Sequence, residues 1–144
     1  MICCWCYIDG VVIDWSSEFD QWLGRLITHA DGDDARAETQ LDLVYAQLAY
    51  LQDLKGEPSE DTPILKRVRQ SRVYPVWRVA DPFVDGVAVR LIVWFSSDRP
   101  DEMVIVLFAG DKANMGDVFY DSVGTRADAA VSSYLMATEG EGHD

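Results

Sequence analysis

Five basic side chains and no acidic one lie within the thirteen residues from Lys66 to Arg78. The whole chain of 144 residues has a formal net charge of −13, so this run is an island of positive charge. Lysine and arginine gathered in this way offer charge-assisted hydrogen bonds to phosphate groups. We predict an anion-binding surface here, with Lys66, Arg67, Arg69 and Arg72 as its side chains. A solvated connection between two elements is the alternative interpretation.

The acidic residues are concentrated in the N-terminal part of the chain. Residues 1–62 hold 3 basic and 13 acidic side chains, whereas residues 63–144 hold 9 basic and 12 acidic side chains. Because the Debye length is about 8 Å at physiological ionic strength, exposed acids on a distant face would weaken a local basic patch only modestly. An acidic protein can therefore still carry a local anion site.

The N-terminal half is predicted to contain a strand and two helices. The apolar strand begins near Ile2 and ends at Ile13. Residues 17–20 have the form of a capping box, and residues 31–34 form a loop with a second N-cap. Apolar side chains at helical spacing predict the buried stripes. They are Phe19, Trp22, Leu23 and Leu26 in the first helix, and Leu41, Val44, Leu48 and Leu51 in the second, which should end near residues 56–58.

Beyond the basic run the apolar period changes to two, which is typical of strands. A turn signal at residues 85–86 predicts that residues 76–83 pair antiparallel with residues 87–95. The near-continuous apolar run 103–108 predicts a strand inside the sheet, and apolar positions within residues 119–134 predict a final helix.

These elements predict one domain of residues 1–136, in which residues 1–10 extend the first strand, followed by a disordered acidic tail of residues 137–144. The predicted fold class is α+β, with an antiparallel-dominated sheet on which two N-terminal helices and one C-terminal helix pack. No apolar run reaches the roughly 18 residues that span a bilayer, and the N-terminus lacks the pattern of a secretory signal. We therefore expect a cytoplasmic protein.

Three cysteines, Cys3, Cys4 and Cys6, crowd the N-terminus, and the two histidines are His29 and His143. An odd number of thiols placed so close together excludes a disulfide framework, and neither histidine has the spacing of a zinc site. We predict packed or idle thiols, with no metal and no cofactor.

Six short motifs follow one another along the chain: Trp15–Leu23, Gly56–Pro58, Val76–Arg78, Val89–Phe95, Ala109–Lys112 and Phe119–Tyr120. Their order resembles the RelE/HigB superfamily of toxins from type II toxin–antitoxin modules, and most closely its phage-derived Gp49-like branch. Members of that branch show an opening Glu-Phe with a Trp-Leu pair and then a Gly-x-Pro connection. A Glu-Leu-Arg strand, an Ile-Arg-x-Leu-Phe strand, a Gly-Asp-Lys motif and a Trp-Tyr pair follow. The resemblance covers roughly residues 11–136.

The resemblance implies a RelE-like fold and an endoribonuclease, an mRNA interferase that cleaves mRNA on the ribosome and so inhibits translation. It implies a cognate antitoxin of the helix-turn-helix type as protein partner, with mRNA and the ribosome as targets and no membrane. In this interpretation Lys66, Arg67, Arg69 and Arg72 follow the phosphates that flank the cleavage site.

The resemblance also implies a catalytic centre. Attack of a ribose 2′-hydroxyl on the adjacent phosphate needs cations that offset developing charge and groups that move two protons. Arg78 and Arg90 would clamp the scissile phosphate, although an outward salt bridge is the alternative for Arg90. Lys112 would act as a point charge. Asp111 would accept a proton or else cap local backbone amides, and Tyr120 would donate a proton, stack on a base or simply pack in the helix.

The chain departs from the family pattern at Val76, where the family has glutamate, and at Phe119, where it has tryptophan. It is also acidic, whereas family toxins are usually basic. Two alternatives therefore stay open. One is a catalytically inactive RelE-like protein that binds a protein partner through its sheet or acidic helices, and the other is an acidic RNA mimic with an antitoxin-like role. Salt-sensitive RNA binding separates the nuclease from both.

Overall fold

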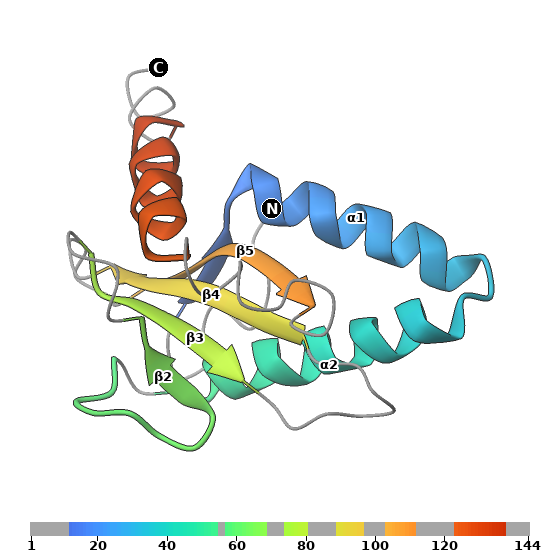
Figure 1. Cartoon of the computed structure of the whole chain (residues 1–144), viewed down its shortest axis with the longest axis horizontal. Helices are drawn as coiled ribbons and strands as arrows, with labels where there is room; N and C mark the ends of the chain where they lie inside the picture. The colour runs from blue at the N-terminus through green and yellow to red at the C-terminus, as the bar shows by residue number, and fades with distance from the viewer. Residues whose placement is uncertain are drawn as a thin grey trace.

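The structure of the chain is a computed structural model that describes residues 12–54, 57–68, 74–80, 89–96, 103–111 and 123–137. Within these ranges the chain forms an α+β fold of three helices and one five-stranded, mostly antiparallel sheet (Figure 1). The predicted N-terminal extension with its cysteines, the turn at residues 85–86 and the acidic tail from residue 138 onward lie outside the described residues. No helix in the described ranges is both long enough and apolar enough to cross a membrane.

Helix α1 (Ser17–Asp31) has its N-cap one residue earlier than the predicted capping box. The cap is Ser16, whose Oγ accepts a hydrogen bond from the backbone N–H of Phe19 at 3.1 Å. The predicted stripe is largely confirmed, because Phe19, Leu23 and Leu26 are buried. Trp22 is half-buried against the same core.

Helix α2 (Ala35–Gln52) has its N-cap at Asp34, within the predicted loop of residues 31–34, and ends before the predicted residues 56–58. Val44 and Leu51 of the predicted stripe are fully buried. Gln47, which sequence reasoning did not place in the core, is also fully buried and donates its Nε2 to the backbone carbonyl of Val89 at 3.0 Å. This hydrogen bond ties α2 to the sheet.

The sheet has the strand order β1-β5-β4-β3-β2. The strands are Val12–Trp15 (β1), Leu65–Arg67 (β2), Val76–Ala80 (β3), Val89–Ser96 (β4) and Met103–Asp111 (β5). The antiparallel pairing of β3 with β4 and the inner position of β5 confirm the predictions. Two features were not predicted: β2 pairs antiparallel with β3, and β1 runs parallel to β5. The basic run thus enters the sheet through β2.

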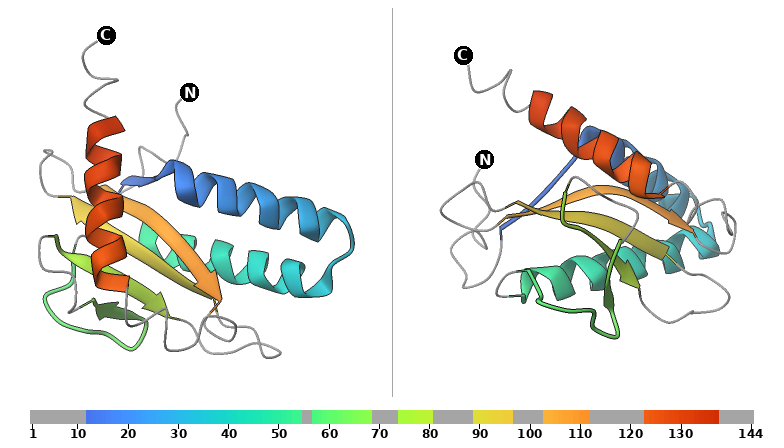
Figure 2. Two further views of the ribbon diagram at one scale, coloured as in Figure 1. Left: turned by 45° about the horizontal axis from the view of Figure 1, so that its top comes forward. Right: turned by 60° about the vertical axis from the view of Figure 1, so that its left-hand side comes forward.

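Both faces of the sheet are covered. The α1–α2 face packs against the two N-terminal helices through alternate strand residues, which include Leu65, Trp77, Val79, Leu91, Val93, Phe95, Val104 and Val106. The helix of residues 123–137, here named the C-helix, covers the opposite face (Figure 2). On this C-helix face Val68, Val76, Ile92, Trp94, Ile105, Leu107 and Phe108 pack with Val123, Ala127 and Val131 of the helix. Burial on both faces explains the continuous apolar run of residues 91–95 within β4.

Strand β5 contains a β-bulge. Val93 is paired with Val106 and the preceding residue Ile92 with Phe108, so Leu107 has no paired residue on β4. Ser16, the cap of α1, donates its hydroxyl to the carbonyl oxygen of Leu107 at 2.5 Å. A bulge shifts the alternation of a strand by one residue, so each side chain beyond it lies on the opposite face from the one that an unbroken strand would give it.

Candidate functional site

Arg78 and Arg90 lie on the C-helix face. Arg78 alternates with Val76 along β3 and Arg90 with Ile92 along β4, and both apolar residues belong to this face. Arg78 is directly opposite Ile92, so Arg90 occupies the diagonal position. Diagonal neighbours on antiparallel strands are about 7–8 Å apart at the backbone, within reach of long side chains. The two arginines predicted to act together therefore share one face on adjacent strands.

Lys66 adds a third cation to the same face. It lies on β2 directly opposite Arg78. Like charges at directly opposite positions destabilise a strand pair. The side chains of Lys66, Arg78 and Arg90, named the cationic triad here, thus span three neighbouring strands and concentrate positive charge on one face.

Partial burial strengthens the field of the triad. Arg90 is 8% exposed, and Lys66 and Arg78 are half-buried. The Nε atoms of both arginines are shielded from solvent, and Nη1 of Arg90 donates to the carbonyl of Val89 at 3.4 Å. Electrostatic interactions are stronger where water is excluded. An oxyanion held here would therefore be bound more tightly than on an open surface, and the guanidinium fork matches phosphate geometry.

The bulge in β5 shapes the space beside Arg90. It places Gly110 directly opposite Arg90, where an unbroken register would place Ala109. Glycine has no side chain, so this neighbour leaves room on the face for a long guanidinium group and for what it binds.

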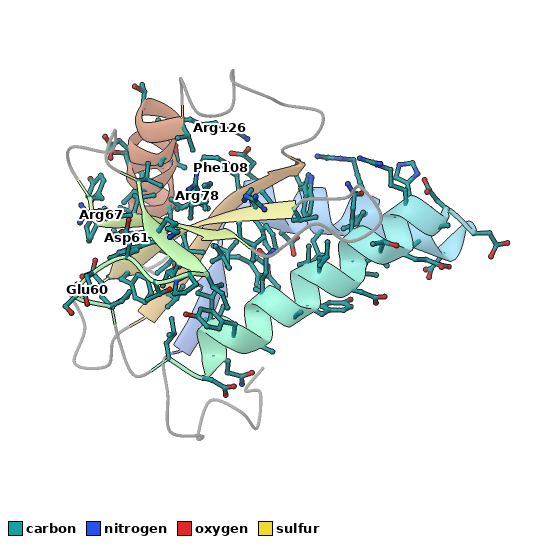
Figure 3. The ribbon with its side chains drawn as sticks, turned by 60° about the horizontal axis from the view of Figure 1, so that its bottom comes forward. Glu60, Asp61, Arg67, Arg78, Phe108 and Arg126 are labelled. Atoms are coloured by element: carbon teal, nitrogen blue, oxygen red, sulfur yellow. The ribbon has the colours of Figure 1, made fainter. Side chains whose placement is uncertain are left out.

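A cross-strand row connects the triad to the C-helix. In this row each residue is paired with the next one across the sheet: Lys66 on β2, Arg78 on β3, Ile92 on β4 and Phe108 on β5. Arg126 of the C-helix covers Phe108, with its Cζ atom 3.9 Å from the ring centroid (Figure 3). The row therefore carries a positive charge at both ends, and its middle is apolar.

Further aromatic rings lie on this face. Trp94 makes edge-to-face contacts with Tyr74 and Tyr134, with 5.6 Å and 6.4 Å between ring centroids. Trp94 is only 4% exposed and packs in the core beneath the C-helix, so it offers no face to a base. Tyr74 and Tyr134 are half-buried, and their exposed parts are aromatic surface of the kind on which unpaired RNA bases stack.

Arg67 lies on the opposite face from Lys66, because adjacent residues of a strand alternate. It is paired with Trp77 in register, and its Cζ atom is 6.0 Å from a Trp77 ring centroid. Its backbone N–H donates to Oδ1 of Asp61 at 2.9 Å. Glu60 and Asp61 line the same cleft as Arg67, which has a volume of about 690 Å³ (Figure 3). The sheet thus separates two neighbours that the sequence grouped in one surface.

The remaining predicted site residues are only partly located. Asp111 ends β5 and is paired in register with Val89, one position beyond Gly110. Outside the described residues lie Arg69, Arg72, Lys112 and Tyr120.

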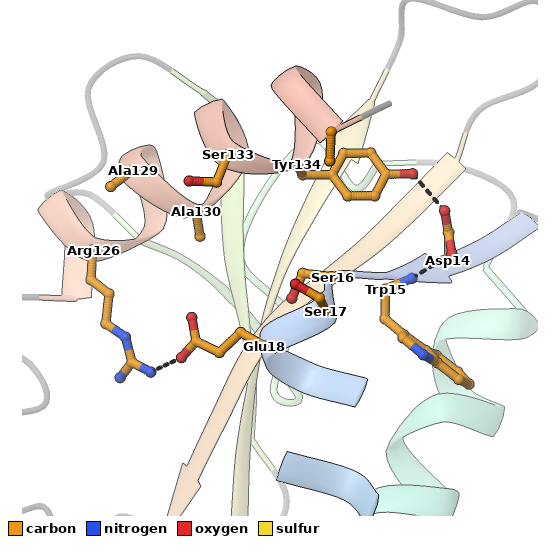
Figure 4. Close-up of a pocket in the computed structure, with 11 residues that line it drawn as sticks. Asp14, Trp15, Ser16, Ser17, Glu18, Arg126, Ala129, Ala130, Ser133 and Tyr134 are labelled. Atoms are coloured by element: carbon orange, nitrogen blue, oxygen red, sulfur yellow. Dashed lines mark hydrogen bonds and ion pairs between the residues drawn. The ribbon is translucent and has the colours of Figure 1, made fainter. Parts of the chain in front are cut away.

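A cleft of about 490 Å³ lies between the C-helix and the β1–α1 junction (Figure 4). Two polar contacts cross it. Tyr134 donates its hydroxyl to Oδ2 of Asp14 at 2.5 Å, and Arg126 donates from Nη2 to the carboxylate of Glu18. Sequence reasoning missed Arg126, because a single arginine on a predicted helix forms no pattern.

Among the described residues no group of three or more His, Cys, Asp and Glu side chains is placed to hold a metal ion. Comparisons of the chain with protein-family models, with curated proteins and with solved structures found no match. Function must therefore be inferred from the residues and their arrangement.

Proposed function

We propose that this chain is a RelE/HigB-like toxin: an endoribonuclease that cleaves mRNA on the ribosome, inhibits translation and is silenced by a helix-turn-helix antitoxin. The observation that carries the proposal is the cationic triad. Arg78 and Arg90 occupy diagonal positions on one face of adjacent strands, and Lys66 lies opposite Arg78. Such an arrangement suits a phosphate whose charge increases during reaction.

In the proposed reaction a ribose 2′-oxygen loses its proton to a base and attacks the adjacent phosphorus. The bond from phosphorus to the 5′-oxygen breaks, that oxygen takes up a proton, and a 2′,3′-cyclic phosphate remains. Arg78 and Arg90 hold the non-bridging oxygens, and Lys112 adds positive charge. Asp111 accepts the first proton, and Tyr120 supplies the second or stacks on a base.

The acidic composition is compatible with this proposal. Residues 1–62 carry 13 acidic side chains and include α1 and α2, which pack on the face of the sheet opposite the triad. Exposed charges separated by more than a Debye length, about 8 Å, are largely screened from each other. The acids exposed on the far sides of these helices therefore leave the field of the triad largely intact.

Expression of the chain alone in bacteria tests the proposal. It should arrest growth and reduce protein synthesis, and co-expression of a partner encoded beside it should restore both. Purified protein added to ribosomes with bound mRNA should produce fragments that end in a 2′,3′-cyclic phosphate. The Arg78→Ala variant should produce none.

Normal growth at high expression, together with intact mRNA in the ribosome assay, would contradict a nuclease. It would favour the inactive RelE-like protein that binds a partner. In that case the first surface to test is the outer side of α2, where Tyr45 is 50% exposed and lies three residues after Asp42.

A further inference from the structure

Arg126 on the C-helix is fixed by two contacts. Its guanidinium covers the ring of Phe108, which is only 1% exposed, with 3.9 Å from Cζ to the ring centroid. Nη2 donates to the carboxylate of Glu18 on α1 (Figure 4). Together the aromatic ring and the carboxylate restrict the positions that the guanidinium group can take.

The side chain of Arg126 remains partly accessible. It is 40% exposed and lines the cleft of about 490 Å³ between the C-helix and the β1–α1 junction. RNA-binding proteins stack unpaired bases on guanidinium planes as well as on aromatic rings. An arginine whose orientation is already fixed loses little entropy when a base stacks on it.

Arg126 lies close to the triad. It covers Phe108, and Phe108, Ile92 and Arg78 are consecutive in one cross-strand row, so Phe108 and Arg78 are two strands apart. Adjacent strands are about 4.8 Å apart, which makes this separation about 10 Å at the backbone. A phosphate held by the triad would carry a neighbouring nucleoside to Arg126.

We propose that Arg126, held by Phe108 and Glu18, is a stacking platform for one base of single-stranded RNA beside the phosphate bound by the triad. This inference rests on the proposed function and adds a base contact to it. Every base has a flat face, so stacking tolerates all four bases. The platform therefore adds affinity and sets the position of the strand, and it leaves sequence choice to other contacts.

The test uses a short RNA with 2′-O-methyl groups at every position, which cannot be cleaved. Each nucleotide in turn is replaced by an abasic one, and the affinity of each RNA is measured by fluorescence anisotropy at low salt. Wild-type protein should lose about tenfold or more in affinity at one abasic position. Arg126→Ala should bind the intact RNA as weakly as wild type binds that abasic RNA. The abasic substitution should not lower the affinity of Arg126→Ala any further.

Two further variants separate the effect of the flat guanidinium group from the effect of its positive charge and from a loss of folding. Arg126→Lys keeps the charge but has no plane, so it should retain the salt dependence of wild type and lose the response to the abasic position. Arg25→Ala removes an exposed arginine from α1, away from the C-helix, and should bind every RNA as wild type does. Melting temperatures close to wild type show that both variants are folded.

The outcomes separate this inference from the proposed function. If Arg126→Ala and Arg126→Lys respond to the abasic position as fully as wild type does, the platform is refuted and the proposed function stands. If wild-type protein binds none of these RNAs, the platform is refuted, and the proposed function is decided separately by mRNA cleavage on ribosomes.

Discussion

Lys66 and Arg78 face each other directly across β2 and β3, so two cations occupy a position where opposite charges would stabilise the sheet. Like charges directly opposite each other weaken a strand pair, whereas the same two charges attract an anion. Binding sites commonly sacrifice stability in this way.

Replacement of Lys66 by glutamate should therefore stabilise the protein and weaken RNA binding. An opposite-charge pair across two strands contributes about 0.2–1 kcal/mol, so the free energy of unfolding in urea should rise by about that amount. RNA affinity, measured by anisotropy, should fall because the triad loses a positive charge and gains a negative one.

Arg67→Glu is the matched control, since it makes the same change of charge at the next residue on the opposite face. It should leave RNA affinity close to the wild-type value. Equal weakening by Lys66→Glu and Arg67→Glu would mean that RNA does not distinguish the two faces of the sheet, and the triad would lose its assigned role.

Arg90→Ala should abolish growth arrest and slow mRNA cleavage by a hundredfold or more, which corresponds to about 3 kcal/mol in the activation barrier. Arg90→Lys should restore little activity, because an ammonium group cannot make the two-pronged phosphate contact. Cleavage rates on ribosomes measure both effects, and circular dichroism checks the fold. A fully toxic Arg90→Ala variant would remove this residue from the mechanism.

Arg78→Ala should flatten the salt dependence of RNA binding. Each phosphate contact with a single strand contributes about 0.7 to the slope of log affinity against log salt concentration. Loss of one contact should lower the magnitude of that slope by about this amount in a titration series. An unchanged slope would show that Arg78 does not contact a phosphate.

Ser16→Ala should lower the free energy of unfolding by about 2 kcal/mol, because the hydroxyl both caps α1 and satisfies the Leu107 carbonyl. Ser17→Ala, at the exposed first residue of α1, should change it by less than about 0.5 kcal/mol. Urea denaturation of both variants makes the comparison. A larger loss of stability in Ser17→Ala than in Ser16→Ala would show that Ser17 is the cap, as the sequence pattern predicted.

The helices were predictable because their signals are local. The cap of α2, Asp34, lies within the loop of residues 31–34 where the sequence predicted a cap, and the apolar spacing in α1 identifies Phe19, Leu23 and Leu26 as core. Gln47 could not be predicted as buried, since its partner is a backbone carbonyl 42 residues away on β4.

The non-local features of the sheet could not be predicted. Strand β2 has three residues and is hidden in the basic run, so no alternation reveals it. The run Met103–Phe108 is apolar throughout and gives no sign of the bulge at Leu107. The parallel pairing of β1 with β5 joins distant segments that no local pattern connects.

The same difference between local and tertiary signals explains why only some residues on the cationic face were predicted from the sequence. Arg78 and Arg90 belong to one antiparallel pair, so alternation along β3 and β4 decides their shared face. Lys66 joins them only through β2, and Arg126 only through the packing of the C-helix on Phe108. These last two placements depend on tertiary contacts that the sequence does not display.

The pairing of β1 with β5 also determines when the sheet can close. Val12 meets Met103, about 90 residues further along the chain. Ribosomes add roughly 5–20 residues per second, so β1 waits roughly 5–20 s for its partner to be synthesised. Pairing between such distant segments also makes folding slow. A protein proposed to cut mRNA on ribosomes would thus complete its sheet only after the ribosome has translated its message as far as β5.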